Sequence, residues 1–165
     1  YEAEDFKKAF PLLERAFEGG VDDPELVVRL AYCRATIGGD TEGALAILRE
    51  SAGKHPDYPR TFYELGFISS EFGTGEPAEN LRRAINYTLQ AVKLDSTEWR
   101  YKDNLGMFYD RRGVGDSAAL WLRAARELKS DHPELNARLA QLEAYLEEQA
   151  RADSAAAGDT LELAP

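Results

Sequence analysis

Two histidines and one cysteine are the residues whose types suit metal binding or nucleophilic catalysis. His55 and His132 each stand directly before a proline, in segments that are typical of turns. Zinc needs three or four clustered ligands, and these two histidines are far apart in the chain. A reactive thiolate needs a cationic neighbourhood, but Arg34, next to the single cysteine Cys33, points elsewhere on a helix. We therefore interpret the histidines as turn or cap residues and Cys33 as a buried packing residue.

Carboxylates and glycine pairs are the other candidates for chemistry. Catalytic carboxylates need environments that separate their pKa values, whereas most acidic residues here fall at helix caps and on helix faces, as solvated charge does. The pairs Gly73-x-Gly75 and Gly113-x-Gly115 follow no strand and precede no Lys-Ser/Thr, so they are not phosphate loops. We expect no enzyme activity, no metal and no cofactor.

The bulk composition limits the partners. The chain has 165 residues and a formal net charge of -10. This charge argues against nucleic acid and anionic membranes and mildly favours a basic protein partner. No apolar run approaches the ~20 residues that span a bilayer, and no stretch of these residues predicts a targeting segment. We expect no membrane insertion and a natural protein that continues N-terminally from Tyr1. The sequence leaves the compartment unknown, with the cytoplasm and the periplasm both open.

Apolar residues at three- and four-residue steps predict eight helices, and no period-two pattern predicts a strand. The helices run over about 5–18, from Pro24 to the stop at Gly38, from the cap at Asp40 to the turn at Lys54, and over about 59–72, 78–94, 98–112, 117–129 and 133–151. Pro11 leaves two interpretations of the first helix, a later start or a kink. The residues from 152 onward predict a flexible tail, with docking of the tail in a groove as the alternative.

A repeated phrase relates these helices to one another. Leu65-Gly66 and Leu105-Gly106 are each followed by a glycine seven residues on, and then by an alanine track. The tracks are Ala84-Thr88-Ala91 and Ala118-Leu122-Ala125. A small residue in the first helix facing an alanine in the second lets two antiparallel helices approach closely.

This pattern resembles the tetratricopeptide repeat. The resemblance implies an all-α fold, a right-handed superhelical α-solenoid of antiparallel helix hairpins. It divides the chain into a repeat domain over 1–151 and a tail over 152–165; the domain comprises a partial repeat at 1–20, repeats at about 22–56, 59–95 and 97–130, and a cap helix at 133–151. The second repeat has Ala31 in place of the glycine and one extra turn residue. The third has Ser69 in place of an aromatic residue and about six extra residues at 73–79, which are either slack or reach a partner.

The resemblance also implies a function, a non-enzymatic module that binds a peptide or helix of another protein in a concave groove. The partner-binding residues that it implies are Tyr32, Arg60, Tyr63, Phe67, Arg100, Asp103, Met107, Asp110, Arg111, Gln141 and Tyr145. The aromatic residues and Met107 would form the floor, unless the rings pack only among themselves. Arg60 and Arg100 would hold a carboxylate at one edge. A complete clamp for a terminal carboxylate is not expected, because Glu64, Tyr63 and Phe67 stand where basic and amide side chains are wanted.

Two alternatives remain open. In the first alternative, the segment is a spacer or a self-association element. It would pair through an N-terminal edge that exposes apolar surface beside Phe6, Phe10 and Leu13. Otherwise it is the arm of an enzyme whose catalysis lies outside residues 1–165.

Overall fold

The structure, a computed structural model, describes the backbone of residues 3–161 and the side chains of residues 6–154. Within that range it contains eight α-helices, one π-helical segment and no strand. The helices are α1 (Ala3–Glu18), α2 (Pro24–Cys33), α3 (Thr41–Lys54), α4 (Pro59–Glu71), α5 (Pro77–Leu94), α6 (Trp99–Arg111), α7 (Gly115–Leu128) and α8 (Pro133–Leu161), and the π-helical segment is Arg34–Gly38. The predicted all-α solenoid of helix hairpins is confirmed.

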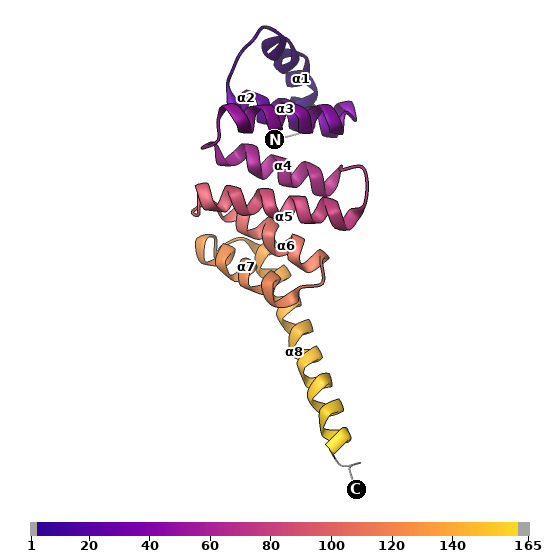
Figure 1. The fold of residues 1–165 in the computed structure, drawn as a ribbon. Helices are drawn as coiled ribbons and strands as arrows, with labels where there is room; N and C mark the ends of the chain where they lie inside the picture. Colours follow the sequence, from indigo (N-terminus) through magenta and orange to yellow (C-terminus); the bar gives the residue numbers. More distant parts are fainter. Residues whose placement is uncertain (1–2, 162–165) are drawn as a thin grey trace.

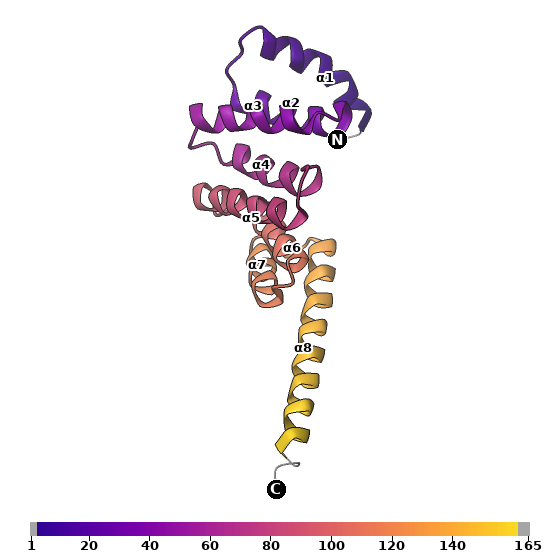
Figure 2. The ribbon, with the colours of Figure 1, turned by 45° about the vertical axis from the view of Figure 1, so that its right-hand side comes forward.

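The helices follow one another along a single stack (Figure 1). Each helix from α1 to α7 contacts the next, with the most extensive contacts between α4 and α5 and between α6 and α7. Helices α2 and α4 also touch directly, so the first helices of neighbouring pairs lie side by side. Helix α8 packs on α7 and then leaves the stack, as the turned view also shows (Figure 2).

The predicted close approach within each pair is confirmed at both glycines. A Cβ atom added at Gly66 would lie 2.9 Å from the carbonyl oxygen of Ala84 and would also collide with the Thr88 hydroxyl. A Cβ atom at Gly106 would lie 2.5 Å from Cγ of Leu122 and 3.3 Å from the carbonyl oxygen of Ala118. Real Cβ atoms do not come this close to other atoms, so only glycine fits these two positions without a shift.

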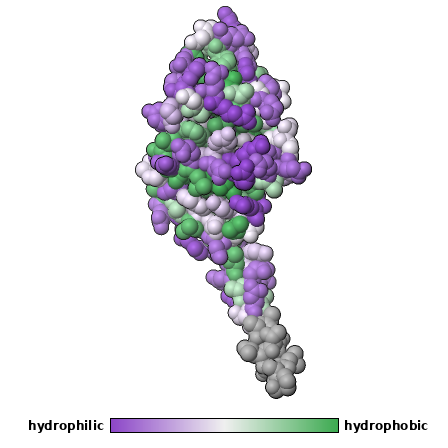
Figure 3. Space-filling model, viewed as in Figure 1, coloured by the Kyte–Doolittle hydropathy of each residue, from purple (hydrophilic) through white to green (hydrophobic). Residues whose placement is uncertain are grey.

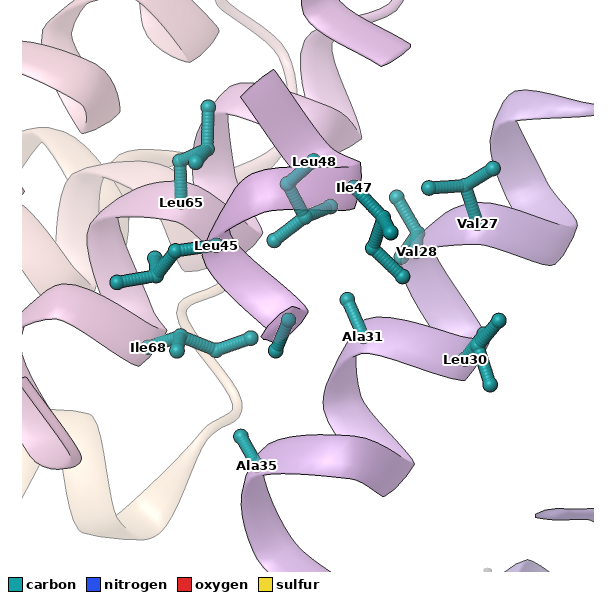
Figure 4. Packing of buried hydrophobic residues seen from close by; sticks show 11 residues of the cluster. Val27, Val28, Leu30, Ala31, Ala35, Leu45, Ile47, Leu48, Leu65 and Ile68 are labelled. Atoms are coloured by element: carbon teal, nitrogen blue, oxygen red, sulfur yellow. The ribbon is translucent and has the colours of Figure 1, made fainter. Parts of the chain in front are cut away.

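The apolar stripes that predicted the helices form the core. Side chains from α2, α3 and α4 converge on one cluster, which includes Val28, Leu48 and Ile68 (Figure 4). Two further clusters join α5 to α6 and α7 to α8. Cys33 is fully buried, as predicted, and burial raises the pKa of its thiol. Asp23 and Asp40 cap α2 and α3 through backbone N–H groups at 3.0 and 2.9 Å, also as predicted.

Three local features differ from the sequence prediction or add to it. Helix α1 begins at Ala3 and contains Pro11 within it, so the interpretation that this helix starts later is wrong. The end of α2 widens into a π-helical turn, which holds the extra residue of the second repeat, and the left-handed Gly39 (φ 68°) ends it. Helix α8 continues ten residues beyond its predicted end, because the alanine-rich stretch after Arg151 favours helix and carries no stop signal before Gly158. The freedom of the tail to move stays a prediction, and residues 162–165 lie outside the described residues.

The N-terminal end of the stack is less open than the sequence predicts. Phe10 and Leu13 of α1 pack against the first core cluster, and Phe6 is half-buried. The large apolar side chain of α1 that faces solvent is instead Leu12, which is 66% exposed. Polar side chains cover much of the visible face of the stack, with apolar ones between them (Figure 3). Between residues 3 and 161, no helix is both long and apolar enough to cross a bilayer.

Candidate functional site

The predicted groove residues fall on the first helix of each pair. Helices α2, α4, α6 and α8 begin at Pro24, Pro59, Trp99 and Pro133. Counting from these starts, the predicted residues other than Asp110 recur at equivalent positions and form rows across the helices. One row crosses all four helices, at Tyr32, Phe67, Met107 and Gln141. We call the surface that these rows share the first-helix face.

Aromatic rings on the first-helix face pack against one another. The ring of Tyr32 on α2 lies 6.3 Å from that of Phe67 on α4, at 23° between planes, and 5.2 Å from that of Phe6 on α1. Tyr63 on α4 lies 5.0 Å from Tyr101 on α6, and burial raises the pKa of the Tyr63 hydroxyl. Tyr32, Tyr63 and Phe67 nevertheless stay half-buried. They therefore pack among themselves and still present part of their surface, so the two interpretations from the sequence are not exclusive.

The predicted arginines already have carboxylate partners. Nη1 of Arg60 donates to both carboxylate oxygens of Glu25, at 2.7 and 2.9 Å. Arg100 pairs with Glu98 at 3.2 Å, next to the start of its own helix. Arg111 on α6 reaches back to Glu71 on α4, at 2.5 Å. To hold a carboxylate of a partner, as the sequence predicts for Arg60 and Arg100, these side chains have to exchange one anion for another.

The remaining predicted residues divide into one structural residue and four others. Asp103 on α6 is buried and forms an ion pair with Arg138 on α8, so it holds the cap helix to the stack. Met107 is half-buried, next to Phe108 in the chain. Asp110 at the end of α6 is exposed, as are Gln141 and Tyr145 on α8. The structure thus brings Tyr32 and Phe67 together, and it assigns Asp103 a partner within the chain.

Sequence reasoning gave no binding role to two residues that stand out here, Glu64 and Asn104. Both are 6% exposed, although both are polar. Oε2 of Glu64 and Nδ2 of Asn104 are buried without a hydrogen-bond partner. Burial raises the pKa of Glu64 to about 7, against the lowering effect of Arg60. The signal was available in the sequence, because each residue stands one place before a repeated Leu-Gly pair.

Two hollows open at the surface, and Glu64 lines the smaller of them. The smaller, of about 110 Å³, lies between α1, α2 and α4 and is lined by Phe6, Val28, Arg29, Tyr32, Arg60 and Glu64. The larger, of about 970 Å³, is bordered by the extended turn before α5 and by the ends of α4 and α6. Its walls include Arg82, Arg111 and Arg112. The six extra residues of the third repeat therefore shape a cleft, and whether a partner enters it stays a prediction.

The histidines take part in two separate turns. Nε2 of His55 lies 3.2 Å from a carboxylate oxygen of Asp22. Nδ1 of His132 lies 3.3 Å from the backbone N–H of Leu135, and its ring packs 4.6 Å from Trp99. The interpretation of both as turn or cap residues is confirmed.

Comparison with known proteins identifies the fold. No protein-family model matches the chain, and no curated protein matches it. Among solved structures, TTC0263, a thermophilic TPR protein in Thermus thermophilus, matches with a TM-score of 0.72 at 23% identity, over 86% of this chain and 74% of that one. MamA matches with a TM-score of 0.69 at 17% identity, over 84% and 77%. YrrB, described as a TPR protein with an unusual peptide-binding site, matches with a TM-score of 0.66 at 18% identity, over 84% and 67%.

Proposed function

The chain has the tetratricopeptide-repeat fold, and we propose that its first-helix face binds a peptide or a helix of another protein. The observation that carries this proposal is the row of half-buried aromatic rings that runs from Tyr32 to Phe67, with Tyr63 beside it. Such rings offer large apolar contact areas at a low entropic cost, as binding hot spots do. YrrB is described as having a peptide-binding site on the same fold.

The polar atoms of the face support the same proposal. A buried donor or acceptor without a partner costs about 1–3 kcal/mol. Oε2 of Glu64 is such an atom, in the middle of α4. A peptide carries donors in its side chains as well as in its backbone, so it offers what this atom lacks. We propose a non-catalytic role, in which Arg60, Arg100 and Arg111 orient the peptide through exposed guanidinium groups.

The test is selection of binders from a random peptide library, followed by a double substitution on the face. Tyr63→Ala with Met107→Ala should weaken the selected peptide at least ~10-fold, which is about 1.4 kcal/mol. Helicity by circular dichroism should stay unchanged. The matched control is Leu120→Ala with Leu128→Ala, which removes two exposed apolar side chains from α7. If the control weakens binding as much as the face variant, the peptide binds elsewhere.

A second candidate is self-association through the N-terminal end, and one observation favours it. Leu12 and Val21, which are 66% and 46% exposed, lie at this end of the stack. Light scattering over a range of concentrations tests it. A dimer that Leu12→Ser abolishes supports self-association, and a monomer at all concentrations excludes it.

A further inference from the structure

We propose that Glu64 and the hollow beside it bind one basic side chain, arginine or lysine, of the peptide that occupies the first-helix face. This inference rests on the proposed function and names the chemistry of one subsite. It predicts that the first-helix face prefers peptides with arginine or lysine at one position, which neither the fold nor the row of aromatic rings specifies.

The geometry places an unpaired carboxylate at the wall of a small cavity. Glu64 lies in the middle of α4, is 6% exposed and still lines the hollow of about 110 Å³. No described residue donates a hydrogen bond to its Oε2 atom. A buried carboxylate without a donor is strongly disfavoured, so a donor that reaches this atom from the hollow, with a small shift of the carboxyl group, gains a charge-assisted hydrogen bond.

The cations nearest to Glu64 are held by another carboxylate. Glu25 on α2 accepts hydrogen bonds from Nε of Arg29 at 2.7 Å, from Nη1 of Arg60 at 2.7 and 2.9 Å, and from the Tyr58 hydroxyl at 2.7 Å. Glu25 therefore binds both arginines that line the hollow. With these two arginines, Glu25 and an ionised Glu64, the formal charges of the four groups balance. Among the residues that the structure describes, none forms an ion pair with Glu64, and both local arginines contact Glu25 instead.

The walls of the hollow suit the flat, delocalised cation of arginine. The rings of Phe6 and Tyr32 lie 5.2 Å apart, tilted by 48°. Aromatic faces attract guanidinium and ammonium groups, and Val28 adds an apolar surface for the methylene stem. The volume equals that of about three to four liquid waters, which matches the head of one side chain. The net charge of -10 also draws basic partners toward the chain.

The ionisation of Glu64 makes the binding of a cation depend on pH, whereas water or a neutral amide in the hollow should not show this dependence. Its pKa of about 7 means that the free protein holds a proton there at pH 6 and has released it at pH 8. A cation binds the ionised form, so affinity for a basic peptide should rise with pH across this range. Among the side chains that the structure describes, the titratable and charged groups around Glu64 are Glu25, Arg29 and Tyr32 of α2, Arg60 and Tyr63 of α4, and Tyr101 of α6.

The experiment is an NMR titration of the full chain with three acetylated, amidated pentapeptides. Each has four alanines around a central arginine, lysine or glutamine. The arginine and lysine peptides should give saturable shifts at the amides of Glu64 and Tyr32, with affinity rising about 10-fold from pH 6 to pH 8, as a pKa of about 7 requires. The glutamine peptide should give no saturable shift there.

Two variants make the result specific. Glu64→Gln should weaken the arginine peptide roughly 10-fold, the loss of one charge-assisted hydrogen bond, and should abolish the pH dependence. Glu71→Gln, a matched change of a more exposed carboxylate on the same helix, should do neither. Equal binding of the arginine and glutamine peptides, no saturation by any of them, or an unchanged affinity in Glu64→Gln overturns the proposal. If the library-selected peptide still needs Tyr63 and Met107 in that case, the groove stands and only this subsite is wrong.

Discussion

Replacing Glu64 by glutamine should stabilise the folded protein, and the gain should depend on pH. The folded-state pKa of Glu64 is raised from 4.5 to about 7. Below pH 4.5 the carboxyl is neutral in both the folded and the unfolded chain, and its ionisation then has no effect on the free energy of unfolding. Above pH 7 it is ionised in both states, and the folded state is penalised. The two pKa values differ by about 2.5, and one unit corresponds to about 1.4 kcal/mol, so the full penalty is about 3 kcal/mol.

The assay is urea denaturation of the parent chain and of Glu64→Gln, followed by circular dichroism at several pH values. The difference in free energy of unfolding should be near zero at pH 4, should grow through pH 5–7 and should level off at about 3 kcal/mol by pH 8. Glu71→Gln, whose carboxylate is exposed, should change stability by less than about 1 kcal/mol at every pH. The reasoning is refuted if Glu64→Gln is destabilising at pH 8, or if its effect is the same at pH 4 and pH 8.

Three further predictions test the packing. Gly66→Ala should lower the free energy of unfolding by about 1–2 kcal/mol, because the new Cβ would lie 2.9 Å from a backbone oxygen of α5. Gly53→Ala, whose new Cβ would meet nothing within 4 Å, should raise the free energy of unfolding by about 0.5–1 kcal/mol. Equal urea midpoints for the two variants would contradict the close approach of α4 and α5. Arg138→Ala should cost about 1–2 kcal/mol in thermal unfolding, since it leaves the buried Asp103 unpaired; no change would mean that the leucines alone hold α8. Cys33 should react with iodoacetamide at least ~100-fold more slowly in the native protein than in urea, because burial raises its pKa and blocks access, and comparable rates would show that the site opens.

The fold was predictable because its main determinants are local in the sequence. Gly66 and Gly106 each mark where two consecutive helices touch, and the structure places each opposite the alanine that the sequence predicted, Ala84 and Ala118. The helix ends follow from caps such as Asp40, whose side chain bonds the backbone N–H of its own helix. Such interactions span a few residues or one hairpin, so the order of residue types is enough to reveal them.

The candidate site was less predictable because its chemistry depends on which side chains meet across repeats. The sequence presents Arg60 as a cation available to a partner, but Glu25, 35 residues earlier, already binds it. Likewise, Asp103 appears as a groove carboxylate until Arg138 of the cap helix is seen beside it. Rotamers and partners at this distance are set by the stacking of the helices, which a one-dimensional pattern does not contain.

One position illustrates both what the sequence contains and what only the structure adds. The residue before each Leu-small pair is Arg29, Glu64, Asn104 and Arg138 on the four first helices. The two arginines of this row are paired with Glu25 and Asp103, and Asn104 is neutral. Only Glu64 combines a charge, deep burial and an oxygen without a donor among the described residues.

A buried serine or threonine can satisfy its hydroxyl by bonding a carbonyl one turn back in its own helix, but a glutamate has no such local remedy. Arg60 stands one turn before Glu64 in the same helix and is turned instead toward Glu25 on α2. The fold therefore keeps a carboxylate at a position where its raised pKa predicts that glutamine is more stable. Because Glu64 lowers the stability of the fold and lies at a surface hollow, a role in binding a partner explains its presence better than a role in packing does.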